Sequence, residues 1–150
     1  MAAFVTLRDV RKEYRMGEVL IKASDGISFE LEKGEFVVIV GPSGAGKTTV
    51  LNMLGGMDTC DSGEIIVDGQ DIARLKKKEI TRYRRYDIGF VFQSYNLIQG
   101  MTAVENVAMP LMFRRVSRKK REEAAREMLK QVGLGERMDH RPNEMSGGQQ

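Results

Sequence analysis

The sequence is poor in cysteine and has no long apolar run. Cys60 is its single cysteine, which excludes an internal disulfide framework and favours a reducing compartment. The longest wholly apolar runs, Met1–Val5 and Phe36–Val40, are far shorter than the roughly 20 residues of a membrane-spanning helix. No secretory signal is visible, because charged residues begin at Arg8. From these three observations we expect a cytoplasmic chain without a membrane span of its own. We also find no internal repeat.

The composition is otherwise that of an ordinary globular protein. The chain has 150 residues, of which 41% are hydrophobic and 30% are charged, so it is long enough for one domain. The net charge of +3 favours anionic partners slightly. A charge of this size does not by itself require nucleic acid as a partner.

Residue patterns divide the chain into a β-rich part, 1–92, a helical part, 93–145, and a short closing segment, 145–150. Phe36–Val40 and Ile88–Phe92 are apolar runs typical of buried strands. Further strands are predicted at Phe4–Leu7, Ile27–Leu31 and Glu64–Val67. Helices are predicted at Lys47–Leu54, at Lys76–Arg85, from the Thr102–Glu105 capping box to Phe113, and from Arg118 to Val132.

A glycine-rich loop follows the predicted strand Phe36–Val40. It reads Gly41-Pro42-Ser43-Gly44-Ala45-Gly46-Lys47-Thr48-Thr49 and fits the pattern G-x-x-x-x-G-K-[ST]. Glycines let successive backbone N–H groups point at phosphate oxygens, and a helix N-terminus adds donors and partial positive charge. Lys47 is expected to reach the β- and γ-phosphates, and the Thr48 hydroxyl to bind Mg²⁺. A chance match in a glycine-rich turn is the alternative, but the strand before the loop and the helix after it favour a nucleoside triphosphate site, with ATP as the expected ligand.

A second motif closes the chain. Met145-Ser146-Gly147-Gly148-Gln149 places a good N-cap residue before two glycines, an arrangement that exposes backbone donors to an anion. Alone, such a segment is typical of a flexible polar turn. Together with the phosphate loop upstream, it makes the chain resemble the nucleotide-binding subunit of ATP-binding cassette (ABC) transporters, whose signature motif normally reads L-S-G-G-Q. Methionine in place of leucine keeps the volume and the apolar character.

The resemblance covers essentially the whole chain and implies roles for further residues. Gln93 lies at the place of the family's glutamine that contacts Mg²⁺ and the attacking water, and Tyr14 at the place of the aromatic residue that stacks on adenine. The stretches 89–97 and 102–110 are most similar to bacterial ATPases of the lipoprotein-release and macrolide-export type. The implied fold is an α/β phosphate-loop ATPase with an antiparallel β subdomain and a helical subdomain.

The family's catalytic carboxylates and switch histidine follow the signature motif, and nothing corresponding follows Gln150. We therefore expect a chain that lacks the C-terminal part of the core, and that binds ATP without hydrolysing it. Asp68 ends an apolar stretch as a magnesium-supporting aspartate would, but Asp68–Gly69 is a hairpin-turn pair, so we interpret it as a turn. His140 precedes the signature motif and is expected to be a surface loop residue.

The resemblance also implies partners. Two copies would enclose two ATP molecules head to tail, with Ser146, Gly147, Gly148 and Gln149 of one copy acting on the ATP held by the other. The pair would drive a separate transmembrane permease from the inner face of the cell membrane, where the chain would be peripheral. The alternative is a cassette ATPase that works on nucleic acid or ribosomes. We do not expect nucleic acid, since DNA-repair relatives carry long insertions between the two motifs.

Overall fold

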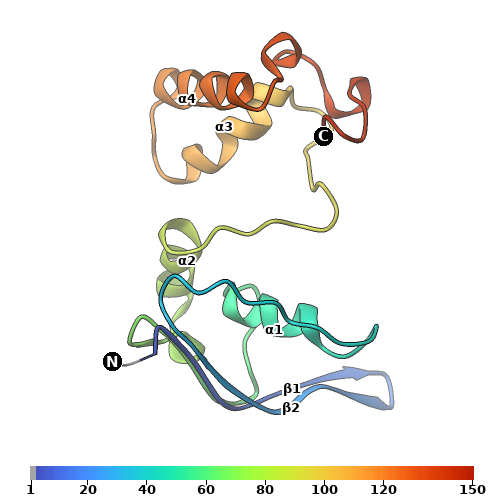
Figure 1. Ribbon diagram of the computed structural model, residues 1–150, viewed down its shortest axis with the longest axis vertical. Helices are drawn as coiled ribbons and strands as arrows, with labels where there is room; N and C mark the ends of the chain where they lie inside the picture. The colour runs from blue at the N-terminus through green and yellow to red at the C-terminus, as the bar shows by residue number, and fades with distance from the viewer. Residues whose placement is uncertain (1–2) are drawn as a thin grey trace. The chain divides into compact units, whose positions relative to one another are not determined.

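The structure is a computed structural model that describes residues 3–150. It divides into two compact units, the first reaching to Gly89 and the second running from Phe90 to Gln150 (Figure 1). Each unit has its own apolar core and is described by itself.

The first unit is built on an antiparallel sheet with the strand order β2-β1-β3-β4. The strands are β1 (Val5–Met16), β2 (Val19–Leu31), β3 (Ser62–Val67) and β4 (Gln70–Asp71). β1 and β2 form the long hairpin at the lower edge of Figure 1. Both strands are longer than the strands predicted at 4–7 and 27–31. The polar outer halves of β1 and β2 pair with each other, which extends both strands beyond their apolar parts.

Two helices cover this sheet. α1 (Lys47–Leu54) begins at the glycine-rich loop and ends before Gly55, as predicted, and α2 (Lys77–Tyr86) follows the 3-10 turn η1 (Ile72–Arg74). The core between helices and sheet contains side chains that are at most 4% exposed. It consists of Leu7, Val10, Val50, Met53, Ile65, Ile72 and Tyr83.

The turn between β3 and β4 confirms the interpretation of Asp68. Val67 pairs with Gln70, and the two intervening residues, Asp68 and Gly69, have φ angles of 48° and 76°. Positive φ at both central positions is the conformation that a two-residue hairpin loop favours. Asp68 is therefore a turn residue.

The two predicted buried strands are wrong. Phe36–Val40 and Ile88–Phe92 have no strand pairing within residues 3–150. Phe36 is 91% exposed and Val91 is 96% exposed, whereas the inward-facing Ile39 and Ile88 still pack on the core. An apolar run becomes a strand only where neighbouring strands pair with its N–H and C=O groups, and this part of the chain supplies none.

The second unit is helical. It contains α3 (Ala103–Phe113), α4 (Arg118–Gln131) and the 3-10 turns η2 (Gly135–Arg137) and η3 (Pro142–Glu144). α3 and α4 pack on each other, as Figure 1 shows. Their shared core consists of Ala103, Val104, Ala108, Ala125, Leu129 and Met138.

The capping box at the start of α3 is confirmed. The Thr102 hydroxyl accepts from the Glu105 N–H at 3.3 Å, and the Glu105 carboxylate accepts from the Thr102 N–H at 2.8 Å. The two reciprocal bonds satisfy N–H groups that the first helical turn would otherwise leave unpaired. The sequence alone therefore located this helix start to the residue.

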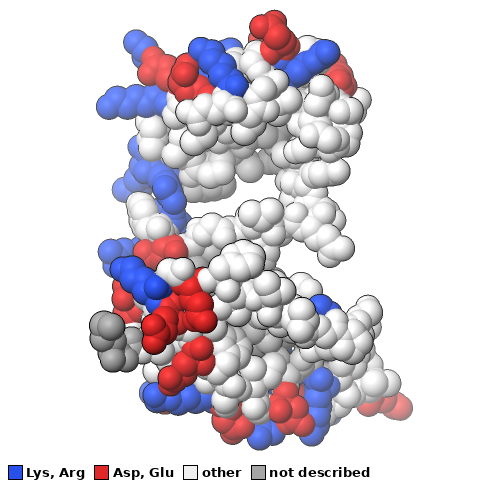
Figure 2. Space-filling model, viewed as in Figure 1, with Lys and Arg blue, Asp and Glu red and all other residues white. Residues whose placement is uncertain are grey.

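The face of the molecule in Figure 2 carries basic and acidic side chains interspersed over both units. Among the described residues, no helix combines the length and the apolar character that crossing a membrane requires.

Candidate functional site

The glycine-rich loop Gly41–Thr49, called the phosphate loop below, turns directly into the first turn of α1. Gly46 precedes that helix with φ 78° and ψ 7°, a left-handed conformation that favours glycine. A Cβ built on Gly46 would lie 2.0 Å from the carbonyl oxygen of Ala23 on β2, so any side chain here would clash with the backbone. The site therefore depends on glycine at this position both for the turn and for the close approach of β2.

Lys47 folds back over the loop. Its ammonium group donates hydrogen bonds to the carbonyl oxygens of Gly41 at 2.8 Å and Pro42 at 2.7 Å. The lysine side chain therefore spans the mouth of the loop and brings a positive charge to the N-terminal end of α1, where N–H groups have no acceptor within the helix. This arrangement of cation and donors suits the oxygens of a phosphate group.

The hydroxyl residues at the start of α1 fit a magnesium ion held mainly by a nucleotide. Thr48 is exposed beside Lys47, and Thr49 is partly buried. Among residues 3–150, no group of three or more His, Cys, Asp or Glu side chains could hold a metal ion. Mg²⁺ usually retains water and binds through one or two protein ligands plus substrate phosphates, a role that a hydroxyl group in this loop can serve.

Tyr14 belongs to a polar cluster beside the C-terminal end of α1. Its hydroxyl donates to the Asp58 carboxylate at 2.5 Å, and the Lys12 ammonium lies 3.2 Å from the same carboxylate. Lys12 also lies 3.5 Å from Asp61 and 5.3 Å from the centre of the Tyr14 ring. Tyr14 as a whole residue is 37% exposed, so part of its surface remains accessible to a ligand.

The protonation states in this cluster support one another. Burial acts to raise the pKa of the Asp58 carboxyl, but hydrogen bonds from Tyr14, the Thr59 N–H and Lys12 outweigh it and lower that pKa. The hydrogen bond to Asp58, followed by burial, raises the pKa of the Tyr14 hydroxyl. Burial acts to lower the pKa of Lys12, yet the nearby Asp58 and Asp61 raise it overall. At neutral pH the cluster therefore holds a neutral phenol, a carboxylate and an ammonium group.

Sequence reasoning missed Asp58 and Lys12. Asp58 follows the glycine pair that ends α1, where a turn residue is the ordinary interpretation. Lys12 lies in a strand with alternating charges, and nothing in that pattern shows that it is buried, with 8% of its surface exposed. Their roles appear only once the 58–61 segment lies beside β1, through the bonds from the Asp61 N–H to the Arg11 carbonyl and from the Glu13 N–H to the Asp61 carboxylate.

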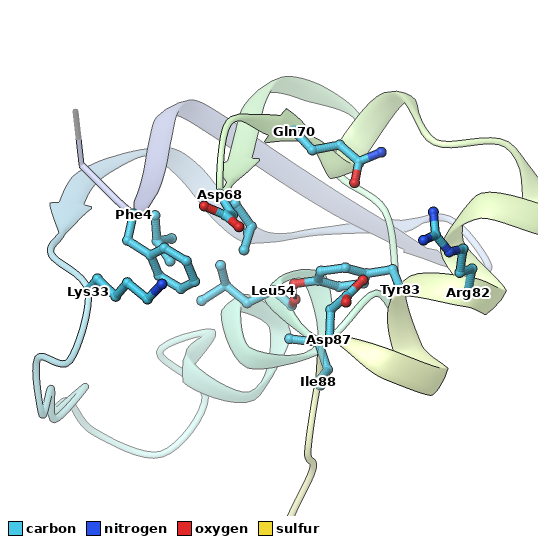
Figure 3. Close-up of a pocket in the computed structure, with 11 residues that line it drawn as sticks. Phe4, Lys33, Leu54, Asp68, Gln70, Arg82, Tyr83, Asp87 and Ile88 are labelled. Atoms are coloured by element: carbon cyan, nitrogen blue, oxygen red, sulfur yellow. Dashed lines mark hydrogen bonds between the residues drawn. The ribbon is translucent and has the colours of Figure 1, made fainter. Parts of the chain in front are cut away.

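The first unit also contains a hollow at the C-terminal end of α1, away from the phosphate loop. It measures about 540 Å³, and Leu54, Tyr83 and Asp87 lie among its lining residues (Figure 3). Leu54 is the last residue of α1, whereas the phosphate loop precedes the first. The hollow is therefore separate from the phosphate loop.

In the second unit, Gln93 lies exposed in the irregular segment that leads to α3. The end of this segment is held by the buried Asn106, whose amide donates to the carbonyls of Ile98, Met101 and Thr102. The structure therefore fixes the point where the segment joins the helix, while the side chain of Gln93 is open to solvent.

The segment Met145–Gln149, called the signature segment below, forms a turn after η3. Ser146, Gly147 and Gly148 are exposed, and the Ser146 carbonyl accepts from the N–H groups of Gln149 at 2.9 Å and Gln150 at 3.1 Å. The Ser146 N–H donates to the side chain of Gln149 at 3.0 Å. The turn is thus preformed, with its two glycines presented to the solvent. His140 is half-buried, and its carbonyl accepts from the Ala103 N–H, so it anchors the start of α3.

Comparison with known proteins identifies relatives along the full chain. The family model described as ABC transporter matches residues 24–150. An uncharacterized ABC transporter ATP-binding protein of Thermotoga maritima is 46% identical over 150 residues, and the chain spans 64% of that protein's length. The macrolide export ATP-binding/permease protein MacB of Marinobacter nauticus is 43% identical over 146 residues, which cover 97% of this chain and 23% of MacB.

A solved structure is similar throughout as well. The ATP-binding cassette MJ0796, in a dimeric post-hydrolysis state bound to ADP and Pi, matches with a TM-score of 0.87 and 44% identity. The match covers 97% of this chain and 64% of the MJ0796 chain. These likenesses confirm the predicted α/β fold class and the resemblance that the phosphate loop and the signature segment first indicated. Since the family model matches well over half of its residues, the chain belongs to the ABC transporter ATP-binding family.

Proposed function

We propose that the chain binds ATP with Mg²⁺ at the phosphate loop, as the nucleotide-binding part of a transporter ATPase. The observation that carries this proposal is the cradle itself. Gly46 brings the loop against β2 at a spacing that admits no side chain, and Lys47 lies across the mouth of the loop. In this proposal Lys47 exchanges its two carbonyl partners for the β- and γ-phosphates, which are stronger acceptors because they are charged.

Titration of ATP with Mg²⁺ into the purified chain, followed by calorimetry, tests the site. We expect saturable binding that weakens at least tenfold in Lys47→Ala. Lys120→Ala is the matched control, since Lys120 is exposed on α4 of the second unit and its loss removes the same charge. Absence of binding in the wild-type chain, or equal affinity of Lys47→Ala and wild type, would overturn the proposal.

The proposed ligand of Mg²⁺ in the phosphate loop is the Thr48 hydroxyl. Thr48→Val removes this hydroxyl at nearly constant shape, whereas Thr48→Ser keeps it. We expect Thr48→Val to bind ATP with nearly the same affinity in Mg²⁺ and in EDTA, while Thr48→Ser retains the magnesium dependence of the wild type. From family membership, we also propose that Gln93 contacts Mg²⁺ and the attacking water.

The proposed partners are a second copy of the chain and a transmembrane permease, with the chain peripheral on the inner face of the cell membrane. The exposed turn of the signature segment supports a second copy, because Ser146, Gly147 and Gly148 present donors outward. Gln149 supports this turn from within. ATP is expected to shift sedimentation from monomer to dimer, and Ser146→Arg to prevent that shift by bulk and charge. A monomer that stays monomeric with saturating ATP would contradict the head-to-tail arrangement.

We further propose that these 150 residues bind ATP without sustained turnover and that hydrolysis coupled to transport belongs to the whole protein. The supporting observation is that Asp68, which a sequence pattern could mistake for a catalytic carboxylate, is a hairpin-turn residue. Phosphate release by the purified chain should equal that of Lys47→Ala. Turnover that Lys47→Ala abolishes would contradict this.

A further inference from the structure

Tyr14 lies near the end of a long hairpin, where its ring would be poorly fixed by packing alone. It pairs with Ile21 on β2, and the two residues are 37% and 42% exposed. A ring that must stack on a flat ligand binds it more strongly if its orientation is set beforehand, because less side-chain freedom is lost on binding. The structure supplies such an orientation through the Tyr14 hydroxyl.

The hydroxyl donates to the Asp58 carboxylate at 2.5 Å, a short bond of the charge-assisted kind. Asp58 is itself fixed to α1, since its N–H donates to the Asn52 carbonyl at 3.2 Å and the Met57 N–H to the same carbonyl at 2.8 Å. Its second carboxylate oxygen accepts from the Thr59 N–H at 2.7 Å. The ring is therefore attached, through one side chain, to the helix whose first turn belongs to the phosphate loop.

Lys12 completes the arrangement. Its ammonium group lies over the Tyr14 ring, 5.3 Å from the ring centre, and 3.2 Å from Asp58, which balances the charge of that partly buried carboxylate. A cation over one face occupies that face and leaves the opposite face for a ligand. Because Lys12 is buried, this side of the ring stays occupied.

We propose that Asp58 is a positioning residue for the nucleotide base, holding the Tyr14 ring at a set angle to the phosphate loop so that a purine can stack on the ring face opposite Lys12. This inference rests on the proposed function, since it requires a nucleotide at the phosphate loop. Asp58 does not touch the ligand. It acts by linking the base-stacking ring and the phosphate-binding helix into one rigid frame.

The test compares two ligands in the presence of Mg²⁺: ATP, which has a base, and inorganic tripolyphosphate, which has none. Tyr14→Phe keeps the ring but removes its bonds to Asp58 and Thr49, whereas Asp58→Asn removes only the charge that strengthens the first of these bonds. We expect both variants to bind ATP about three- to tenfold more weakly. Their affinity for tripolyphosphate is expected to stay within about twofold of wild type. Tyr14→Leu removes the ring and sets the largest loss that base stacking can produce.

Asp61→Asn is the matched control, because Asp61 bonds the same strand and the same lysine without touching Tyr14. It removes a charge next to the same lysine and should leave the ratio of the two affinities unchanged. Equal weakening of both ligands in Asp58→Asn, or wild-type affinity for ATP in Tyr14→Phe, would overturn the positioning role. If the wild-type chain bound neither ATP nor tripolyphosphate, the proposed function would be overturned, and this inference with it.

Discussion

The Tyr83 hydroxyl donates a hydrogen bond to the carbonyl oxygen of Leu54 at 2.7 Å. This bond joins α2 to the last residue of α1, whose carbonyl oxygen has no N–H donor within its own helix (Figure 3). Because Tyr83 is 4% exposed and its ring lies in the core, the bond is partly buried. The end of the phosphate-loop helix is thus held by a side chain 29 residues further along the chain.

Tyr83→Phe keeps the ring in the core and removes this bond. We expect a loss of about 1 kcal/mol in the free energy of unfolding at pH 8, because the Leu54 carbonyl loses its donor. Urea denaturation followed by circular dichroism measures the loss. Tyr86→Phe is the matched control, since Tyr86 is 52% exposed on the same helix, and it should change stability by less than about 0.5 kcal/mol.

The same pair of variants tests how the stability of the first unit depends on alkaline pH. Burial, followed by the charge of Asp87, raises the pKa of Tyr83 to about 12 from the ordinary value of 10.0. A raised pKa in the folded state means that the protonated phenol stabilises the fold. That contribution is complete below pH 10 and is lost as pH rises towards 12. The stability advantage of wild type over Tyr83→Phe should therefore shrink across this range, and a constant difference would contradict the raised pKa.

Asn106 holds the segment before α3 with four hydrogen bonds. Its amide donates to the carbonyls of Ile98, Met101 and Thr102, and its oxygen accepts from the Ile98 N–H at 2.8 Å. Asn106→Ala is expected to destabilise the second unit by about 2–4 kcal/mol, because several partly buried groups lose their partners together. Hydrogen exchange should show faster exchange at the Ile98 N–H. Asn143→Ala, at an exposed position, should leave exchange and stability unchanged.

Local signals explain where prediction from the sequence succeeded. The ends of α1, the capping box of α3 and the hairpin turn at Asp68 all depend on residues close together in the chain. The phosphate loop is a local motif for the same reason. Phe36–Val40 has an equally clear local pattern, but a central strand exists only beside its neighbours, and residues 3–150 provide none.

The Lys12–Asp58–Tyr14 cluster shows the other limit. Its members come from β1 and from the turn after α1, and their meeting depends on the pairing of β1 with β3, which begins at Ser62. The family resemblance identifies Tyr14 from the sequence. It does not identify Asp58, since an aspartate after a glycine pair predicts a turn whatever its side chain contacts. Pairing between distant segments, rather than any motif, decides what lies around the ring.

Ser24 carries an unsatisfied hydroxyl in the first unit. It is 4% exposed, and within residues 3–150 its oxygen has no hydrogen-bond partner. Ser24→Ala is expected to stabilise the unit by about 1 kcal/mol, because the desolvation penalty of the hydroxyl disappears. Ser28→Ala is the same change on the same strand, but the Ser28 hydroxyl accepts from the Asp9 N–H at 2.8 Å, so this variant should lose about 1 kcal/mol. Destabilisation by both substitutions, measured in urea, would show that Ser24 has a partner such as a bound water.

Gly44 and Gly46 allow the two reasons for glycine in the phosphate loop to be separated. Both have left-handed backbones, with φ angles of 81° and 78°. A Cβ on Gly44 would meet no atom within 4 Å, whereas a Cβ on Gly46 would lie 2.0 Å from the Ala23 carbonyl. Gly44→Ala therefore adds backbone strain of about 1–2 kcal/mol to the loop. Gly46→Ala adds the same strain and also forces the loop away from β2.

We expect Gly46→Ala to weaken ATP binding at least a hundredfold, because the displaced loop no longer aims the first N–H groups of α1 at one point. Gly44→Ala should weaken it about tenfold at most, in line with strain alone. Calorimetry with ATP and Mg²⁺ measures the affinity of both variants. Thermal unfolding of each variant shows whether a weaker affinity comes from a displaced loop or from unfolding of the first unit. Equal affinities in the two variants would mean that the contact with Ala23 yields at little cost, and that backbone conformation alone demands glycine at position 46.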